Sequence, residues 1–134
     1  KIILFFLLSF APACNQNKQD ALTDQLLEAF ITQNKHGLIY TWSQGMPLSY
    51  QALKFIKEIA LENKLPLIIT HDPGNRRSFD KQSLTLKSEK LIRKGVTLHY
   101  PSLVMFKNKK LLSRIKYGYE TKEGFRQYLK EAWP

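Results

Sequence analysis

The chain has 134 residues, of which 43% are hydrophobic, a length that allows one domain with a core of its own. Its 21 Lys and Arg residues outnumber 11 Asp and Glu residues, and the formal net charge is +10. A single cysteine, Cys14, excludes a disulfide within the chain and therefore a mechanism that alternates between a dithiol and a disulfide.

The first thirteen residues have the layout of an export signal. Lys1 precedes an apolar run over residues 2–10, and the small-residue segment 11–13 follows directly before Cys14. The apolar run is shorter than the roughly 20 residues that a transmembrane helix needs. We therefore expect a signal peptide over residues 1–13, a polar tether over 14–20 and one folded domain over 21–134.

Cys14 occupies the position of the lipid-modified cysteine in a bacterial lipoprotein signal. Acylation would give this lone thiol a use in an oxidising compartment. Ala11 and Pro12 depart from the usual lipoprotein pattern, so ordinary cleavage after Ala13 remains an alternative. Both alternatives predict an exported protein of the bacterial cell envelope, either anchored to a membrane through Cys14 or periplasmic.

The first half of the domain predicts a βαβ unit. Apolar residues at helical spacing predict a helix over residues 21–32, and a compact apolar run predicts a buried strand over 37–41. Ser49 is placed to cap a second helix that runs to residue 63, and the next strand is predicted over 65–70. The carboxyl ends of parallel strands meet at one edge of a sheet, where we expect a functional site.

The second half predicts mixed elements. They are a turn over 71–75, a loop to residue 85, a helix over 88–94, a hairpin formed by 103–106 and 111–117, and a last helix from 121. Ser88 and Thr121 are placed to cap the two helices, and Gly95 is placed to end the first of them in a left-handed conformation.

Two segments resemble the thioredoxin-like superfamily. Trp42-Ser43-Gln44-Gly45-Met46 stands where that family carries Trp-Cys-x-x-Cys, and the segment from Tyr100-Pro101 into the next strand is similar to the family's cis-proline segment. The similarity in order and spacing extends over residues 22–133. It implies an α/β thioredoxin-like fold with a central mixed four-stranded sheet flanked by helices.

The resemblance also implies a binding role without thiol chemistry. Ser43 and Met46 occupy the two cysteine positions, and a serine hydroxyl stays un-ionised at neutral pH, so we do not expect thiol-disulfide oxidoreductase activity. A cis-proline would leave the neighbouring backbone free to pair with an extended peptide. We expect an accessory protein that docks an unidentified envelope protein or peptide, without a cofactor. Its expected binding residues are Trp42, Ser43, Gln44, Gly45, Met46, Tyr100 and Pro101.

Three other interpretations use the same edge of the sheet. Met46, His71 and His99 would suit copper as thioether and imidazole ligands, in an envelope metal carrier. Ser43 with His99 as a base would make an unrecognised hydrolytic enzyme. Tyr40, Trp42, Tyr50 and Tyr100 would together form an aromatic recognition surface.

The basic charge by itself does not indicate nucleic acid. The export signal removes the protein from nucleic acid, and no nucleic-acid-binding motif accompanies the lysines and arginines. The charge fits anionic lipid headgroups, an acidic partner or an ordinary solvated surface.

Overall fold

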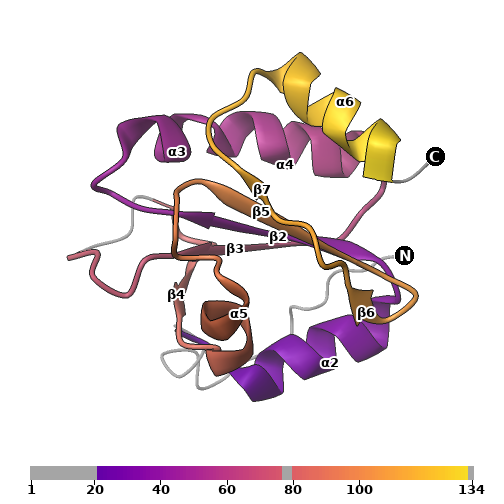
Figure 1. Cartoon of the computed structure of the whole chain (residues 1–134), viewed down its shortest axis with the longest axis horizontal. Helices are drawn as coiled ribbons and strands as arrows, with labels where there is room; N and C mark the ends of the chain where they lie inside the picture. Colours follow the sequence, from indigo (N-terminus) through magenta and orange to yellow (C-terminus); the bar gives the residue numbers. More distant parts are fainter. Residues whose placement is uncertain (1–20, 77–79, 133–134) are drawn as a thin grey trace.

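A seven-stranded mixed sheet forms the middle layer in a computed structural model that describes residues 21–76 and 80–132 (Figure 1). Helices α4 and α6 cover one face of the sheet and α2 and α5 cover the other (Figure 1). The elements are β1 (Ala21–Leu22), α2 (Asp24–Asn34), β2 (Gly37–Trp42), α3 (Pro47–Gln51), α4 (Leu53–Glu62), β3 (Leu67–His71), β4 (Leu84–Leu86), α5 (Glu89–Lys94), β5 (Ser102–Lys107), β6 (Lys110–Leu111), β7 (Lys116–Tyr117) and α6 (Lys122–Ala132).

Strand β2 is the centre of the sheet. It runs parallel to β3, with Trp42 opposite His71, and antiparallel to β5, with Gly37 opposite Phe106. The strand order is β1-β4-β3-β2-β5-β6, and β7 also pairs with β5. All residues of β2 are buried, as expected for a strand with a neighbour on each side and helices on both faces.

Two hydrophobic clusters lie on the two faces of the sheet. One joins Leu38, Tyr40 and Trp42 of β2 to the apolar sides of α4 and α6. The other joins Ile39 of β2 and Phe106 of β5 to α2 and α5. Successive side chains of a strand point to opposite faces, so the continuous apolar run of β2 contributes to both clusters.

The sheet is larger than the four strands predicted. Ala21 and Leu22 form β1 rather than the first turn of a helix, because the Thr23 side chain accepts a hydrogen bond from Leu26 N–H (3.2 Å) and caps α2 after that point. Strand β4 begins at the end of the loop predicted up to residue 85 and runs to Leu86. These strands are two and three residues long, too short for a periodic sequence signal, and they form because β3 and β4 offer edges to pair with.

The helix predicted over 49–63 is divided into α3 and α4. It begins at Pro47 instead of Ser49, and Ser49 is buried inside α3. Other predicted features are confirmed. Ser88 accepts a hydrogen bond from Leu91 N–H (3.2 Å), Gly95 has a positive φ of 109°, and Thr121 accepts one from Gly124 N–H (3.1 Å).

The peptide bond between Tyr100 and Pro101 is cis. It leads directly into β5, so the segment before that strand lies beside the carboxyl end of β2. None of the helices formed by residues 21–76 and 80–132 has the length and continuous apolar character needed to cross a membrane.

Candidate functional site

The loop of residues 43–46 follows the carboxyl end of β2 and is held by one buried serine. The Ser49 hydroxyl accepts a hydrogen bond from Ser43 N–H (3.0 Å) and lies within donor distance of the carbonyl oxygens of Met46 (2.6 Å) and Ser43 (3.0 Å). One hydroxyl therefore ties both ends of the loop together. The sequence predicted a capping role for Ser49 but not its hydrogen bonds to the two ends of this loop.

Asp72 connects this loop to the segment that contains the cis peptide bond. The Ser43 hydroxyl donates to Asp72 Oδ2 at 3.4 Å, and Gly74 N–H donates to Asp72 Oδ1 at 3.1 Å. Burial raises the pKa of Tyr100 to about 12, and the negative charge of Asp72 and a hydrogen bond with it add to the increase. Tyr100 therefore stays protonated at neutral pH. The sequence predicted Asp72 only as part of a turn and not as a partner of Ser43.

A second pair of hydrogen bonds holds Gln44. Its backbone N–H donates to the Asn75 side chain (3.0 Å), and its own side-chain oxygen accepts from Arg76 N–H (2.8 Å). The loops that follow β2 and β3 are thus joined at several points. The arrangement positions the loop of residues 43–46 without any covalent link.

Trp42 lies inside the core, which corrects its expected place on a recognition surface. Its side chain has 0% exposure and contacts the rings of Tyr50 (centroids 5.2 Å apart) and His71 (5.6 Å). Tyr40 is also fully buried, and its hydroxyl donates to the Ser49 carbonyl oxygen at 2.7 Å. Both side chains pack in the core beside the site, and a partner cannot reach them.

His71 is part of a chain of hydrogen bonds that begins at Trp42. The indole N–H donates to the Ser83 hydroxyl (3.0 Å), which lies 2.6 Å from His71 Nδ1. His71 Nε2 in turn lies 3.2 Å from the Thr85 hydroxyl, so each ring nitrogen has a hydroxyl partner within hydrogen-bond distance. Both ring nitrogens have partners in a buried side chain, so this geometry gives no support to the alternative in which His71 binds copper.

We expect this environment of His71 to make stability depend on pH. Burial lowers the pKa of His71 below its ordinary value of 6.5, although Asp72 opposes the shift. The unfolded chain therefore takes up a proton at a higher pH than the folded chain, so stability is full above about pH 6.5 and falls as the pH decreases below it. Urea unfolding between pH 7 and 5.5 should show this slope in the natural chain, and His71→Gln should reduce it.

The control is His36, whose pKa is also lowered by burial and by Lys35 and Lys107. His36→Gln should remove only its own part of the slope and leave the part due to His71. A slope that is unchanged in His71→Gln would show that this ring titrates equally in the folded and unfolded chains.

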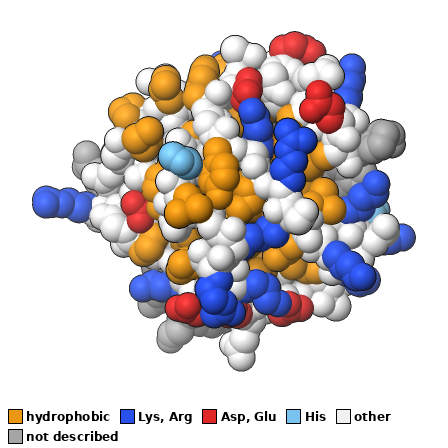
Figure 2. All heavy atoms as spheres, in the orientation of Figure 1, with side chains coloured by type: hydrophobic (Ala, Val, Ile, Leu, Met, Phe, Trp, Pro, Cys, Tyr) orange, Lys and Arg blue, Asp and Glu red, His pale blue; other side chains and the backbone are white. Residues whose placement is uncertain are grey.

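Exposed apolar side chains surround the segments that meet at the end of β2. We call them the hydrophobic rim: Met46 (49% exposed), Leu48 (51%), Leu98 (71%) and Tyr119 (39%). The segment that carries Tyr119 is joined to the cis-proline segment, since the neighbouring Gly118 N–H donates to the Pro101 carbonyl oxygen (2.8 Å). Figure 2 shows hydrophobic side chains gathered on the left half of the visible face, where Figure 1 places α3 and the arrowhead of β2.

The other candidate chemistries gain no support from this geometry. Over residues 21–76 and 80–132, no group of three or more His, Cys, Asp and Glu side chains is arranged to hold a metal ion. His99 is exposed and packs edge-on against Tyr117, with ring centroids 5.5 Å apart. In the same part of the chain the Ser43 hydroxyl bonds to Asp72 and Gly45 N–H and not to His99, so the alternative Ser43–His99 pair is not formed.

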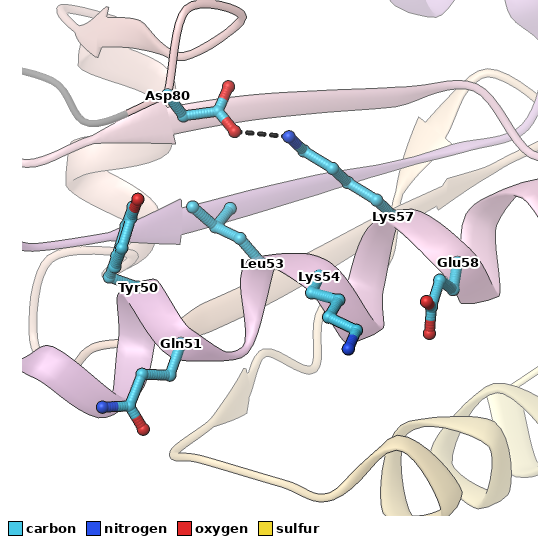
Figure 3. Close-up of a pocket in the computed structure, with 7 residues that line it drawn as sticks. All are labelled: Tyr50, Gln51, Leu53, Lys54, Lys57, Glu58 and Asp80. Carbon is cyan, nitrogen blue, oxygen red and sulfur yellow. Dashed lines mark hydrogen bonds and ion pairs between the residues drawn. The ribbon is translucent and has the colours of Figure 1, made fainter.

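A separate hollow of about 480 Å³ lies along α4 (Figure 3). Lys57 forms an ion pair with Asp80 across it, and Tyr50, Lys54 and Glu58 lie on its walls (Figure 3). Tyr50 contacts Trp42 on one side and borders the hollow on the other. The remaining lining residues do not belong to the predicted site. The ion pair holds Asp80 against α4.

The fold matches solved thioredoxin structures. A Plasmodium falciparum thioredoxin matches with a TM-score of 0.59 and 13% identity, covering 81% of this chain and 93% of its own. A Schistosoma mansoni thioredoxin pre-protein matches with 0.58 and 16%, covering 81% and 91%. The exposed lipoprotein thioredoxin Etrx1 of Streptococcus pneumoniae strain TIGR4 matches with 0.56 and 20%, covering 75% and 89%.

The chain therefore has a thioredoxin-like α/β fold, and the predicted fold class is confirmed. No family model and no curated protein sequence matches it. At these identities the likeness concerns the fold alone, and the role of the site has to be argued from its own residues.

Proposed function

We propose that the protein is a binding or accessory module of the bacterial cell envelope that docks an extended peptide or protein segment at the hydrophobic rim beside Tyr100-Pro101, without thiol exchange. The observation that carries this proposal is a loop held in place by hydrogen bonds that still exposes Met46 at 49%. Apolar side chains fixed at a surface favour binding over chemistry.

The residues at the two cysteine positions support the absence of thiol exchange. The Ser43 side chain is nearly buried, at 5% exposure, and its hydroxyl is engaged by a carboxylate and a backbone N–H. The Met46 thioether has no proton to lose and cannot form a disulfide. The pair therefore offers neither the attacking nor the resolving thiol of an exchange reaction.

The segment before β5 supports docking of an extended chain. Pro101 is buried, and the Tyr100 backbone N–H and C=O form no hydrogen bond with residues 21–76 or 80–132. These two groups are a donor and an acceptor that an extended peptide can pair with, as an added strand does at a sheet edge. Met46 and Leu98 would then contact the side chains of that peptide.

The envelope placement rests on the sequence signal and on one neighbour. The pneumococcal structure is described as an exposed lipoprotein thioredoxin, which is compatible with a lipid-modified Cys14 here. An exported, anchored module without thiol chemistry needs a partner in the same compartment, and a protein or peptide at the rim meets that need.

The test is quantitative capture from the native envelope with variants that remove rim side chains. Met46→Ser and Leu98→Ser should each reduce recovery of a specific partner at least tenfold, because apolar contact area at the centre of an interface dominates affinity. Leu61→Ser is the matched control, since Leu61 is 80% exposed on α4 and outside the rim. Mass spectrometry of the N-terminal peptide in the same material should show a diacylglyceryl group on Cys14.

Equal recovery with the rim variants and with Leu61→Ser would contradict docking at the rim. An unmodified Cys14 would contradict the anchor but would leave the docking surface standing. The two parts of the proposed function can therefore fail separately.

A further inference from the structure

Lysines gather at the end of the molecule opposite the hydrophobic rim. Lys35 and Lys64 lie just before β2 and β3, and the antiparallel pairing of Gly37 with Phe106 brings the β5–β6 turn to the same end. Lys109 N–H donates to the Lys35 carbonyl oxygen at 2.8 Å. We call this end the lysine pole, and it consists of Lys35, Lys64, Lys107, Lys109, Lys110 and Lys130. Figure 2 shows blue side chains at the right, where Figure 1 places β6 and the end of α2.

Acidic groups do not neutralise the pole. The ion pairs found in residues 21–76 and 80–132 use other lysines and arginines and none of these six lysines. Glu62 is nearby but is already bound by Lys122 and Arg126, which leaves Glu131 beside Lys130. The carboxyl ends of α2, α4 and α6 each add about half a negative charge, roughly −1.5 in total, against a charge of +6 on the lysines.

Five of the six lysines occupy positions that local structure disfavours. Lys35, Lys64 and Lys109 have positive φ angles of 62°, 55° and 66°, where glycine or asparagine is preferred. Lys107 and Lys110 are directly opposite each other in the β5–β6 pair, and like charges in that arrangement repel. Residues that break local preferences together at one surface point to a function of that surface.

We propose that the lysine pole is an electrostatic contact surface for anionic lipid headgroups. Protein interfaces are centred on aromatic side chains and arginine, and the pole presents turns with mostly exposed lysines instead, of which Lys109 also donates to the Thr32 carbonyl oxygen. Attraction to an anionic membrane surface needs only clustered positive charge within a Debye length of it. This inference rests on the proposed envelope placement but not on docking at the rim.

The length of the chain before the domain is compatible with this orientation. Ala21 is level with His71 through Thr85, and the amino end of β3 at Leu67 lies four residues back, about 13 Å along the strand. The seven residues 14–20 span at most about 25 Å when extended. An anchor at Cys14 can therefore lie at the level of the pole.

The test compares binding of the full chain to vesicles of phosphatidylcholine alone and mixed with phosphatidylglycerol. The pole variant carries Lys35→Gly, Lys64→Gly and Lys110→Gln. The control variant carries Lys54→Gln, Lys81→Gln and Lys87→Gln, which remove the same charge from exposed positions elsewhere. Glycine at positions 35 and 64 suits a positive φ, so the pole variant should keep its thermal unfolding temperature.

The natural chain should prefer the anionic vesicles, and high salt should abolish the preference. A lysine near such a surface contributes roughly fivefold in affinity, so the pole variant should lose about 100-fold and the control variant no more than several fold. All variants share the N-terminal apolar segment, so its contribution to binding is the same in each of them. Equal losses in the two variants, or no anionic preference in the natural chain, would overturn the proposal.

The result is separable from the proposed docking function. Met46→Ser and Leu98→Ser should bind anionic vesicles as the natural chain does, because neither changes the charge. A failure of vesicle binding would leave partner capture at the rim unaffected.

Discussion

Replacement of Trp42 by alanine is expected to lower the free energy of unfolding by about 3 to 5 kcal/mol. The indole is completely buried between the rings of Tyr50 and His71, and its removal leaves a cavity and takes away the donor that the Ser83 hydroxyl accepts from. Urea unfolding monitored by far-UV circular dichroism measures the change without relying on tryptophan fluorescence.

Leu98→Ala is the control for this loss, because Leu98 is an apolar side chain of the same region with 71% exposure. It should change the unfolding free energy by no more than about 0.5 kcal/mol. If Trp42→Ala cost as little as Leu98→Ala, the indole would be a surface group and its expected role in recognition would return.

Substitution of Gly37 by alanine is expected to cost about 2 to 3 kcal/mol. A Cβ at this position would lie 2.5 Å from Phe106 Cζ, 2.7 Å from Phe106 Cε1 and 3.1 Å from the Pro66 carbonyl oxygen. The Phe106 ring is fully buried and packs edge-on against Phe30 with centroids 5.3 Å apart, so it has little room to move. Equilibrium unfolding at constant pH measures the loss.

Gly124→Ala is the matched control in α6. Its Cβ would meet the side chain of Glu120, which is partly exposed and can turn away. Gly124 lies in the first turn of α6, where the preference for alanine is smaller than the interior value of about 0.5 to 1 kcal/mol, and moving Glu120 gives up a surface ion pair with Lys116 of similar size, so this variant should change the free energy of unfolding by no more than about 1 kcal/mol. If Gly37→Ala cost as little as Gly124→Ala, the Phe106 ring would move aside as easily as a surface side chain.

The fold was largely predictable because its main signals are local. The apolar runs of β2, β3 and β5 and the caps Ser88 and Thr121 are local sequence features, and these elements are present. The second strand of the predicted hairpin, 111–117, is instead divided into β6 and β7, which both pair with β5. Strands β1 and β4 were not predicted because they are short pairings with strand edges that are distant in the sequence. Their formation depends on the rest of the sheet and not on their own composition.

The position of the candidate site was predictable, but the burial of its side chains was not. The pattern placed residues 43–46 and Pro101 at one edge, yet it gave no sign that Trp42 is covered or that Met46 and Leu98 are exposed. The roles of Ser49 and Asp72 depend on hydrogen bonds between segments that only the folded chain brings together. Polar residues in turns and helices carry no sequence signal for such partners.

The hydrogen bonds of Ser49 have a consequence for the thermodynamics of recognition. Because both ends of the loop are already fixed by one buried hydroxyl, little backbone freedom remains to be lost when Met46 meets a partner. The entropy of ordering then falls on the partner, and a segment that is disordered before binding would carry most of it. In the proposed docking role, such a surface would select by shape and favour those chains that can adopt the conformation it already presents.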